Sequence, residues 1–197
     1  MQTQNIPTAA VVVTHDVESY ERWKQAFDAH ADKRRTFGIT NTHINRDAEN
    51  PNHLSIYLAG TDATKLDAFL KSRDLADTMV GAGVKGPPHI AAITPVEDHT
   101  QKKPAAGVIV RHTVKDFDAW KRVFDGDAER RKQAGIIGHA VNRGVADPNL
   151  VVVYLQAESL DSLRTFTSSP DLKQTMQNAG VIGKPDLMFV QGGTWES

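Results

Sequence analysis

The chain has 197 residues, of which 40% are hydrophobic and 24% charged, as is ordinary for a globular protein. The 23 Lys and Arg against 24 Asp and Glu leave a formal net charge of −1, so no bulk positive field attracts nucleic acid. The absence of cysteine excludes disulfides, thiolate metal ligands and a cysteine nucleophile. No stretch approaches the roughly 20 apolar residues that cross a bilayer, and the first residues lack the features of a signal peptide. We therefore expect a cytoplasmic protein with no nucleic-acid or membrane partner.

The dominant feature of the sequence is an internal repeat. His15–Asp28 reads HDVESYERWKQAFD, and His112–Asp125 reads HTVKDFDAWKRVFD. Trp23 aligns with Trp120 at an offset of 120 − 23 = 97 residues, and this offset holds without a gap to the end of each copy. The period is far longer than the roughly 20–50 residues of solenoid repeats. The sequence therefore predicts a duplicated domain.

The first half of each copy predicts a strand followed by a helix. Ala9–Val17 is short and rich in valine, which is typical of a buried strand. Ser19 and, in the second copy, Asp116 then stand where a helix N-cap is expected. A single helix should follow, with a basic last turn and Gly38 or Gly135 just beyond it. Its apolar stripe in the first copy comprises Tyr20, Trp23, Phe27 and Ala31.

The second half of each copy predicts a hairpin, a second helical region and a final strand. Asn50-Pro51-Asn52, matched by Asp147-Pro148-Asn149, is a turn between two strands. The helical region should break and restart near Ser72, and its partner has Pro170 at the first helical position. The strands expected here are 39–46, 53–58 and 90–93 in the first copy and 150–155 and 187–190 in the second.

The order β-α-β-β-α-β is that of a ferredoxin-like unit, so the expected fold class is α+β with two such repeats. We expect repeat 1 over residues 9–97, a linker over 98–105 and repeat 2 over 106–195; the polar stretch 95–104 marks the junction. The helices of one unit cover one face of its four-stranded sheet, and the other apolar face needs a partner. Packing the two sheets against each other would bury both faces within one chain.

The repeat motifs resemble those of the dimeric α/β-barrel superfamily. Each copy has the pattern His-x-Val-x-x-(Tyr/Phe)-x-x-Trp-Lys-x-x-Phe-Asp, an Asx-Pro-Asn hairpin and an Ala-Gly-Val-x-Gly-x-Pro close. In particular, the chain resembles antibiotic-biosynthesis-monooxygenase-like proteins, which usually build the barrel from two chains. The resemblance covers both halves and implies an intramolecular dimeric α/β-barrel. A homo-oligomer of this fused barrel is compatible with the sequence.

His15 and His112 are the histidines present in both copies, and they are the first candidate catalytic residues. On an alternating strand, His15 shares a face with Val11 and Val13. The superfamily usually binds ligands between sheet and helices, where an imidazole can act as a general base or hydrogen-bond donor. The alternative is a structural histidine bonded to nearby backbone.

Other candidate site residues have equally strong structural explanations. Tyr57 and Tyr154 either orient a substrate oxygen or satisfy their hydroxyls at a sheet edge. The predicted ligand pocket is lined by Trp23, Trp120, Phe27, Phe124, Arg34 and Arg131. The aromatic residues also suit core packing, and the arginines, which could hold a carboxylate or phenolate, also suit the last turn of a helix.

No known cofactor motif is present. The sequence has no phosphate-binding glycine loop, dinucleotide fingerprint or nucleophile elbow, and no spacing typical of two histidines and a carboxylate around a metal. Haem-degrading relatives ligate iron with a histidine on the second helix, and residues 62–82 and 159–179 contain no histidine. We therefore expect no metal and no cofactor.

The resemblance implies a small hydrophobic or aromatic ligand and, if the protein is an enzyme, cofactor-independent monooxygenation of an aromatic or enol-like substrate. A non-catalytic ligand-binding or stress-response protein and an isomerase or cyclase are the alternatives. The copies differ at four informative aligned positions: Thr14/Arg111, His30/Asp127, Thr42/His139 and His43/Ala140. Because a fused chain can differentiate its pockets, we expect one active pocket at most, or two pockets with different ligands.

Overall fold

The computed structural model describes the backbone of residues 7–196 and the side chains of residues 7–191. Contacts divide the chain into two compact units. Of the described residues, the first unit contains 7–94 and 194–196, and the second contains Pro95–Gly193. Within the described residues, no helix is long and apolar enough to cross a membrane.

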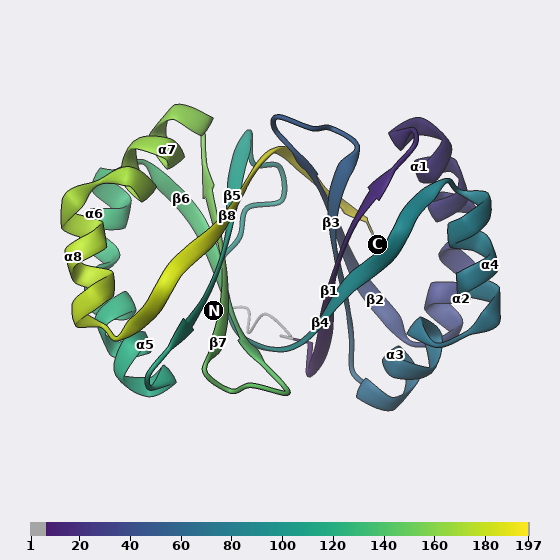
Figure 1. The fold of residues 1–197 in the computed structure, drawn as a ribbon, viewed down its shortest axis with the longest axis horizontal. Helices are drawn as coiled ribbons and strands as arrows, with labels where there is room; N and C mark the ends of the chain where they lie inside the picture. The colour runs from purple at the N-terminus through teal and green to yellow at the C-terminus, as the bar shows by residue number, and fades with distance from the viewer. Residues whose placement is uncertain (1–6, 197) are drawn as a thin grey trace. The chain divides into compact units, whose positions relative to one another are not determined.

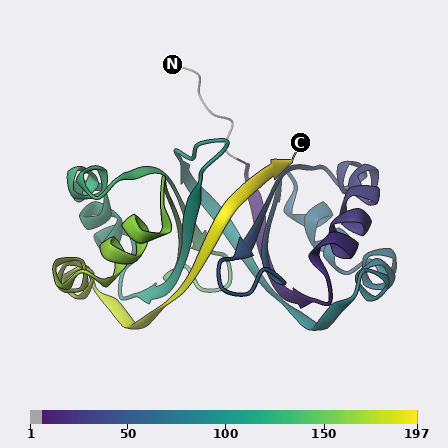
Figure 2. The same ribbon diagram turned by 90° about the horizontal axis from the view of Figure 1, so that it is seen from above.

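The first unit has one four-stranded antiparallel sheet in the order β4-β1-β3-β2. Four helices cover one face of this sheet (Figures 1 and 2). Its elements are β1 (Ala9–Val17), α1 (Tyr20–Ala29), α2 (Ala31–Thr36), β2 (Ile39–Asp47), β3 (His53–Gly60), α3 (Ala63–Leu70), α4 (Arg73–Gly81) and β4 (Val84–Asp98).

The second unit repeats this arrangement with the strand order β8-β5-β7-β6. Its elements are β5 (Ala106–Val114), α5 (Phe117–Gly126), α6 (Ala128–Gln133), β6 (Ile136–Gly144), β7 (Leu150–Ala157), α7 (Leu160–Ser168), α8 (Pro170–Asn178) and β8 (Val181–Glu196). Each unit thus has the β-α-β-β-α-β order, and the predicted α+β fold class with two ferredoxin-like repeats is confirmed.

Local signals explain where the helices begin. The Ser19 hydroxyl accepts a hydrogen bond from the Arg22 backbone N–H at 3.4 Å, and the Asp116 carboxylate accepts one from Ala119 at 2.6 Å. Both N-cap predictions are confirmed. Pro170 occupies the first position of α8, where its missing N–H leaves no helical bond unmade.

The structure differs from the sequence prediction in the first helical region of each unit. A break at His30 (φ −89°, ψ 8°) separates α1 from α2, and a break at Asp127 separates α5 from α6. At the break, the Phe27 carbonyl oxygen accepts hydrogen bonds from the His30 backbone N–H at 3.2 Å and from the Arg34 guanidinium at 2.5 Å, so the side chain of α2 adds a second bond at the end of α1. Arg131 and Phe124 repeat this contact in the second unit. The hydrophobic stripe alone could not show the break, because the stripe continues from α1 into α2.

The last strand of the first repeat also differs from the prediction. β4 extends from Val84 to Asp98 and so includes Pro95 and the first residues of the polar stretch expected to be a linker. Residues 95–98 belong by contact to the second unit. This part of the strand has no strong apolar alternation, so it lacks the pattern from which a strand is predicted.

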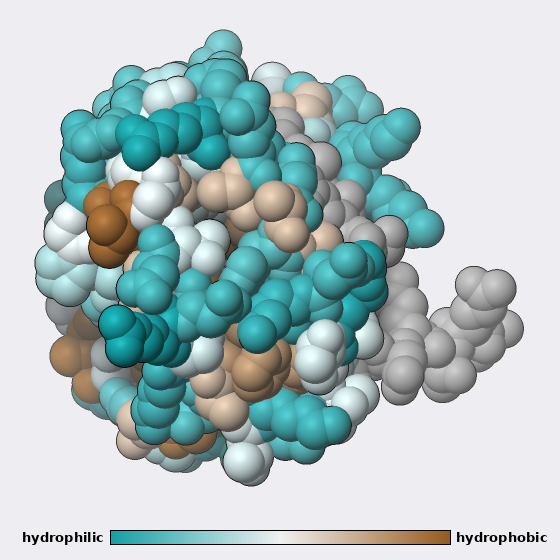
Figure 3. Space-filling model, turned by 90° about the vertical axis from the view of Figure 1, so that its right-hand side faces the viewer, coloured by the Kyte–Doolittle hydropathy of each residue, from teal (hydrophilic) through white to brown (hydrophobic). Residues whose placement is uncertain are grey.

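Each unit has its own hydrophobic core between sheet and helices. Trp23 and Phe69 are buried in the first core, and Trp120 and Phe166 occupy the aligned positions in the second. By contrast, the outer side of the first unit's helices is mostly hydrophilic, with hydrophobic side chains in small separate patches (Figure 3). The helices thus present their apolar stripes inward, as predicted.

Gly107 provides a test of packing in the second unit. A Cβ atom added there would lie 2.5 Å from Tyr154 Cε2 and 2.7 Å from its hydroxyl oxygen. We expect Gly107→Ala to lower the free energy of unfolding by about 1–3 kcal/mol in urea titrations, because the ring must shift within a packed sheet. The control is Gly126→Ala in α5, where nothing lies within 4 Å of the new Cβ. It should leave stability unchanged or raise it by about 0.4–1 kcal/mol; equal losses in both variants would contradict the expected clash.

Candidate functional site

Strand alternation places the paired histidines on the helix-covered face of each sheet. His15 follows Val11 and Val13 on that face of β1 and lies opposite Leu54 of β3. His112 follows Val108 and Val110 on β5 and lies opposite Val151 of β7. Only 7% of His15 and 6% of His112 is exposed to solvent. Both imidazoles therefore lie between sheet and helices, although their predicted chemical role is not thereby tested.

The two imidazoles are held in a neutral state. Burial lowers the pKa of His15 to about 4, against a smaller opposing effect of Asp16, and burial lowers the pKa of His112 to about 4. Among the described residues, neither ring nitrogen of either histidine has a hydrogen-bond partner. Their close neighbours are aromatic: the His112 and Trp120 ring centroids are 5.4 Å apart, and those of His15 and Trp23 are 5.9 Å apart.

A large cavity adjoins His112 in the second unit. Its volume is about 630 Å³, and it lies between the β5, β7 and β8 strands and helices α5 to α8. We call it the second-unit cavity. Trp120 Nε1 is also buried without a partner among the described residues. An unpaired buried polar group costs about 1–3 kcal/mol. His112 and Trp120 line the cavity, so both would gain from a polar ligand atom once a side-chain movement exposes their buried nitrogens. The apolar lining includes Val110, Phe124, Val153, Leu155, Phe166, Leu172, Met176 and Leu187.

The corresponding first-unit cavity is much smaller. It has a volume of about 70 Å³ and is lined by His15, Trp23, Phe27, Arg34 and other residues aligned with the second-unit lining. Leu70 lines the first cavity where Thr167 lines the second. A volume of about 70 Å³ admits little more than water, whereas small-molecule sites usually measure roughly 300–1,000 Å³. The copies have thus diverged in the space they offer a ligand.

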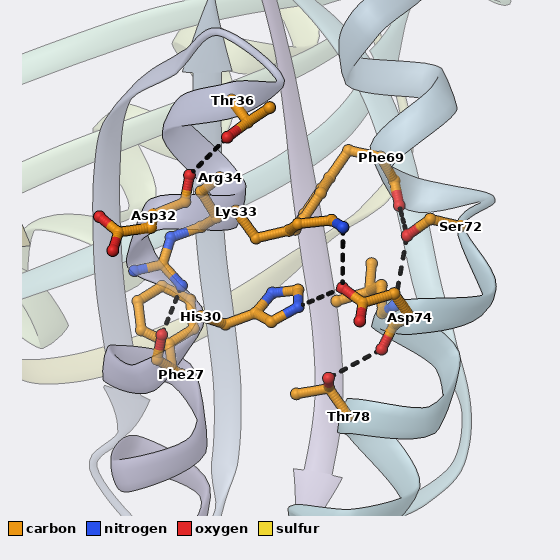
Figure 4. Close-up of polar contacts among 11 residues, drawn as sticks. Phe27, His30, Asp32, Lys33, Arg34, Thr36, Phe69, Ser72, Asp74 and Thr78 are labelled. Atoms are coloured by element: carbon orange, nitrogen blue, oxygen red, sulfur yellow. Dashed lines mark hydrogen bonds and ion pairs between the residues drawn. The ribbon is translucent and has the colours of Figure 1, made fainter.

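An ionic link between helices accompanies the small cavity. In Figure 4, His30 and Lys33 both point toward Asp74, which lies in the first turn of α4. His30 Nε2 is 2.8 Å and Lys33 Nζ is 3.7 Å from Asp74 Oδ2, and the His30 hydrogen bond is the main cause of the lowered Asp74 pKa. The second unit has Asp127 at the position of His30, and Asp127 pairs instead with Arg130 at 2.8 Å. Since Asp171 aligns with Asp74, the same link cannot form there.

The second-unit cavity also carries more positive charge. Lys173 and Lys184, both exposed, line it at positions where the first copy has Ala76 and Pro87. Arg131 lines it too, but its guanidinium stacks 3.7 Å from the Phe124 ring centroid and donates to the Phe124 carbonyl oxygen. Arg131 therefore already has structural contacts, whereas the two lysines line the cavity where they could bind an acidic group of a ligand. Neither lysine was predicted as a site residue; the difference between the aligned copies at these two positions is the sequence signal that points to them.

The structure does not bring the candidate tyrosines to the histidines. Tyr57 pairs with Val12 of β1 and Tyr154 with Ile109 of β5, so each lies on the opposite sheet face from its neighbouring histidine. Neither tyrosine lines the cavity of its unit. Burial raises the pKa of Tyr154 to about 12, and a hydrogen bond with Gln156 partly opposes the shift. The candidate tyrosines therefore do not share a cavity with the histidine of their own unit.

The other predicted pocket residues do line the cavities. Trp23, Phe27 and Arg34 contribute to the first, and Trp120, Phe124 and Arg131 to the second. Trp23, Trp120 and Phe124 are also core residues, so both explanations given for them from the sequence hold together. Sequence reasoning also missed a group of potential metal ligands, Glu97, His99 and His139. Glu97 and His99 are two residues apart at the end of β4, but His139 comes from β6, so spacing along the chain could not show all three together.

Comparisons with known proteins agree with this architecture. No protein-family model matches the sequence. No curated protein matches it either. An anthrone oxidase-like protein aligns with a TM-score of 0.70 and 11% identity over 98% of this chain and 94% of that chain. A candidate monooxygenase from Fusobacterium nucleatum aligns with a TM-score of 0.68 and 14% identity over 98% and 96%.

A further structure links the fold to a named group. A ferredoxin-fold protein from Listeria monocytogenes, described as related to antibiotic biosynthesis monooxygenases, aligns with a TM-score of 0.55 and 11% identity over 94% of each chain. The fold and cavities define a class of protein with ferredoxin-like repeats and apolar space between sheet and helices. This chain shares its ferredoxin-like fold with these monooxygenase-like proteins and has two such repeats in tandem.

Proposed function

We propose that the second-unit cavity binds a small aromatic or enol-like molecule and promotes its oxidation by dioxygen without a cofactor. The observation that carries this proposal is the cavity of about 630 Å³ in which neutral His112 and Trp120 both have unpaired polar atoms. Apolar walls suit the body of such a ligand, and a few polar groups suffice to fix its orientation. Exposed Leu187 extends the apolar surface at the edge of the cavity.

In the proposed reaction, His112 accepts a proton from an activated C–H or enolic O–H of the substrate. The resulting carbanion transfers electrons to dioxygen, so that a CH₂ group and O₂ yield C=O and H₂O. Trp120 Nε1–H takes the donor role that the sequence analysis gave to the tyrosines. A bound ligand that displaces water from the apolar walls would strengthen the electrostatic attraction between the imidazolium and the substrate anion, which offsets the low basicity of the free histidine.

Two further observations support an activated aromatic ligand. One structurally similar protein is named anthrone oxidase-like, and anthrone-type molecules combine aromatic rings with an activated CH₂ group. Lys173 and Lys184 near the cavity favour a ligand that carries or develops negative charge. His15 has little space for such a ligand, because the first-unit cavity measures about 70 Å³.

A non-catalytic ligand-binding protein is the second candidate. The observation that favours it is the pKa of His112, which burial lowers to about 4 and which makes the imidazole a weak proton acceptor. In that case His112 and Trp120 would serve only to recognise a polar atom of the ligand.

Oxygen uptake by the full chain tests the enzymatic proposal. An anthrone and related phenols are added to the purified protein in air-saturated buffer, and dioxygen consumption is recorded together with binding measured by calorimetry. We expect one ligand per chain and consumption of one O₂ per oxidised CH₂, abolished when oxygen is removed. Saturable binding without oxygen uptake would favour the binding protein, and the absence of binding would contradict both candidates.

A further inference from the structure

We propose that Glu97, His99 and His139 form a binding site for a divalent transition metal such as Zn²⁺. The three residues belong to the second unit, and one ligand atom of each lies within 4.8 Å of those of the others. They are not among the residues that line the second-unit cavity. The metal site therefore shares no residue with the proposed oxidation, although the His139 ring lies 5.4 Å from that of the cavity-lining Phe124.

Strand geometry explains how the three side chains meet. Glu97 is near the end of β4, His99 follows two residues later, and His139 is in β6. Alternate residues of an extended chain point to the same side, which brings Glu97 and His99 together. The His99 backbone N–H donates to the His139 carbonyl oxygen at 2.7 Å and holds the two segments side by side. The backbone thus positions the ligands before a metal binds.

The donor atoms suit a borderline transition metal. His139 Nε2 lies 3.1 Å from Glu97 Oε1, and the His99 and His139 ring centroids are 5.0 Å apart. Imidazole nitrogen and carboxylate oxygen bind Zn²⁺ at about 2.0–2.2 Å, which separates two ligand atoms of a tetrahedral ion by roughly 3.3 Å. The Glu97–His139 separation already approaches that value. Two imidazoles with one carboxylate also suit Ni²⁺, Cu²⁺ and Fe²⁺.

The surrounding charges leave one carboxylate oxygen for the metal. Lys121 Nζ lies 3.0 Å from Glu97 Oε2, on the oxygen that does not contact His139. Lys121 also pairs with Asp125 at 2.6 Å, so its positive charge is shared between two carboxylates. The Glu97 and His139 side chains are each 20% exposed, and His99 is exposed. A metal can reach this site from solvent, and three protein ligands leave a coordination position for water.

The cluster is specific to the second repeat. The residue aligned with His139 is Thr42, so the first unit lacks the imidazole around which the other two ligands gather. The first unit does contain a simpler pair, in which His53 Nδ1 lies 2.8 Å from Asp16 Oδ1. One imidazole and one carboxylate bind a transition metal more weakly than three ligands do, so this pair provides a matched control.

Titration of the full, tag-free chain with ZnCl₂ after removal of metal tests the proposal, with CoCl₂ as a spectroscopic probe. We expect one equivalent of Zn²⁺ to bind and Co²⁺ to give the visible absorption of a nitrogen- and oxygen-ligated site. His99→Ala should weaken Zn²⁺ binding by at least the roughly 10–100-fold that even an outer-sphere partner is worth. Glu97→Gln and His139→Ala should act in the same way, and His53→Ala should leave the affinity unchanged.

His99→Ala keeps the proposal falsifiable, since His99 is exposed and its loss removes no core contact. Circular dichroism and thermal unfolding of the metal-free variants verify that each is folded. The absence of saturable Zn²⁺ binding to the unsubstituted chain would overturn the proposal, as would equal affinities of that chain and the His99→Ala variant.

Discussion

His112→Ala is expected to reduce turnover by about 10²-fold or more, which is the usual contribution of a general base, whereas His15→Ala should change it by less than about twofold. Both histidines are buried and neutral, so their own chemistry does not distinguish them. The difference comes from the cavities, which measure about 630 Å³ beside His112 and about 70 Å³ beside His15. Only the former has room for an aromatic ligand.

The measurement is dioxygen uptake with an activated phenol or anthrone, accompanied by the dissociation constant of the same ligand. His112→Gln is the matched variant, because an amide can still form a hydrogen bond to the ligand but cannot act as a base. It should retain binding and lose turnover if His112 is catalytic. Equal effects of the His15 and His112 variants would contradict the expected division between the repeats. If neither variant affects turnover, neither of these two histidines is the base.

Acid is expected to begin to destabilise the protein near pH 6.5, well above the pH range in which carboxylates titrate. Burial lowers the pKa of His15 and of His112 from 6.5 to about 4. Between these pH values the unfolded chain binds protons that the folded chain does not, so the free energy of unfolding falls as the pH falls. At about 1.4 kcal/mol per pH unit, each histidine accounts for a loss of about 3 kcal/mol. The two losses together are a large part of a typical domain stability of about 5–15 kcal/mol.

Urea unfolding at a series of pH values from 8 to 4 measures this effect. His15→Leu and His112→Leu should each remove about 3 kcal/mol of the pH-dependent loss, since leucine takes up no proton. His139, whose pKa burial also lowers, contributes in the same direction and remains in both variants. The lowered pKa of Asp74 acts below this window, because its ordinary value is already 3.8. A free energy of unfolding that is constant from pH 7 to pH 4.5 would contradict the buried, neutral state of the two imidazoles.

Much of the fold could be predicted from residues that act locally. Ser19 and Asp116 mark helix starts because their side chains bond backbone N–H groups three residues later. Val11, Val13 and His15 share a sheet face because strand side chains alternate. Each of these local patterns occurs twice, at the same offset that separates Trp23 from Trp120, which made the duplication evident. The periodicity of apolar residues and the capping of helices depend on residues only a few positions apart, so both can be predicted from the sequence.

Features that depend on distant residues were decided by the tertiary structure. The sequence showed that His30 and Asp127 differ, but not that His30 pairs with Asp74 across two helices. Tyr154 could be placed on a different face from Val153, yet only the folded sheet shows that this face lies away from His112.

The distinction between local and distant interactions also divides what could be known of the functional site. The sequence by itself determined the duplicated ferredoxin-like architecture and the face on which His15 and His112 lie, because both follow from short-range periodicity. The tertiary structure decided that the repeats enclose unequal cavities and that Glu97, His99 and His139 gather in one place. Cavity volume and cross-strand clustering depend on how side chains from several elements pack in space, which no spacing along the chain encodes.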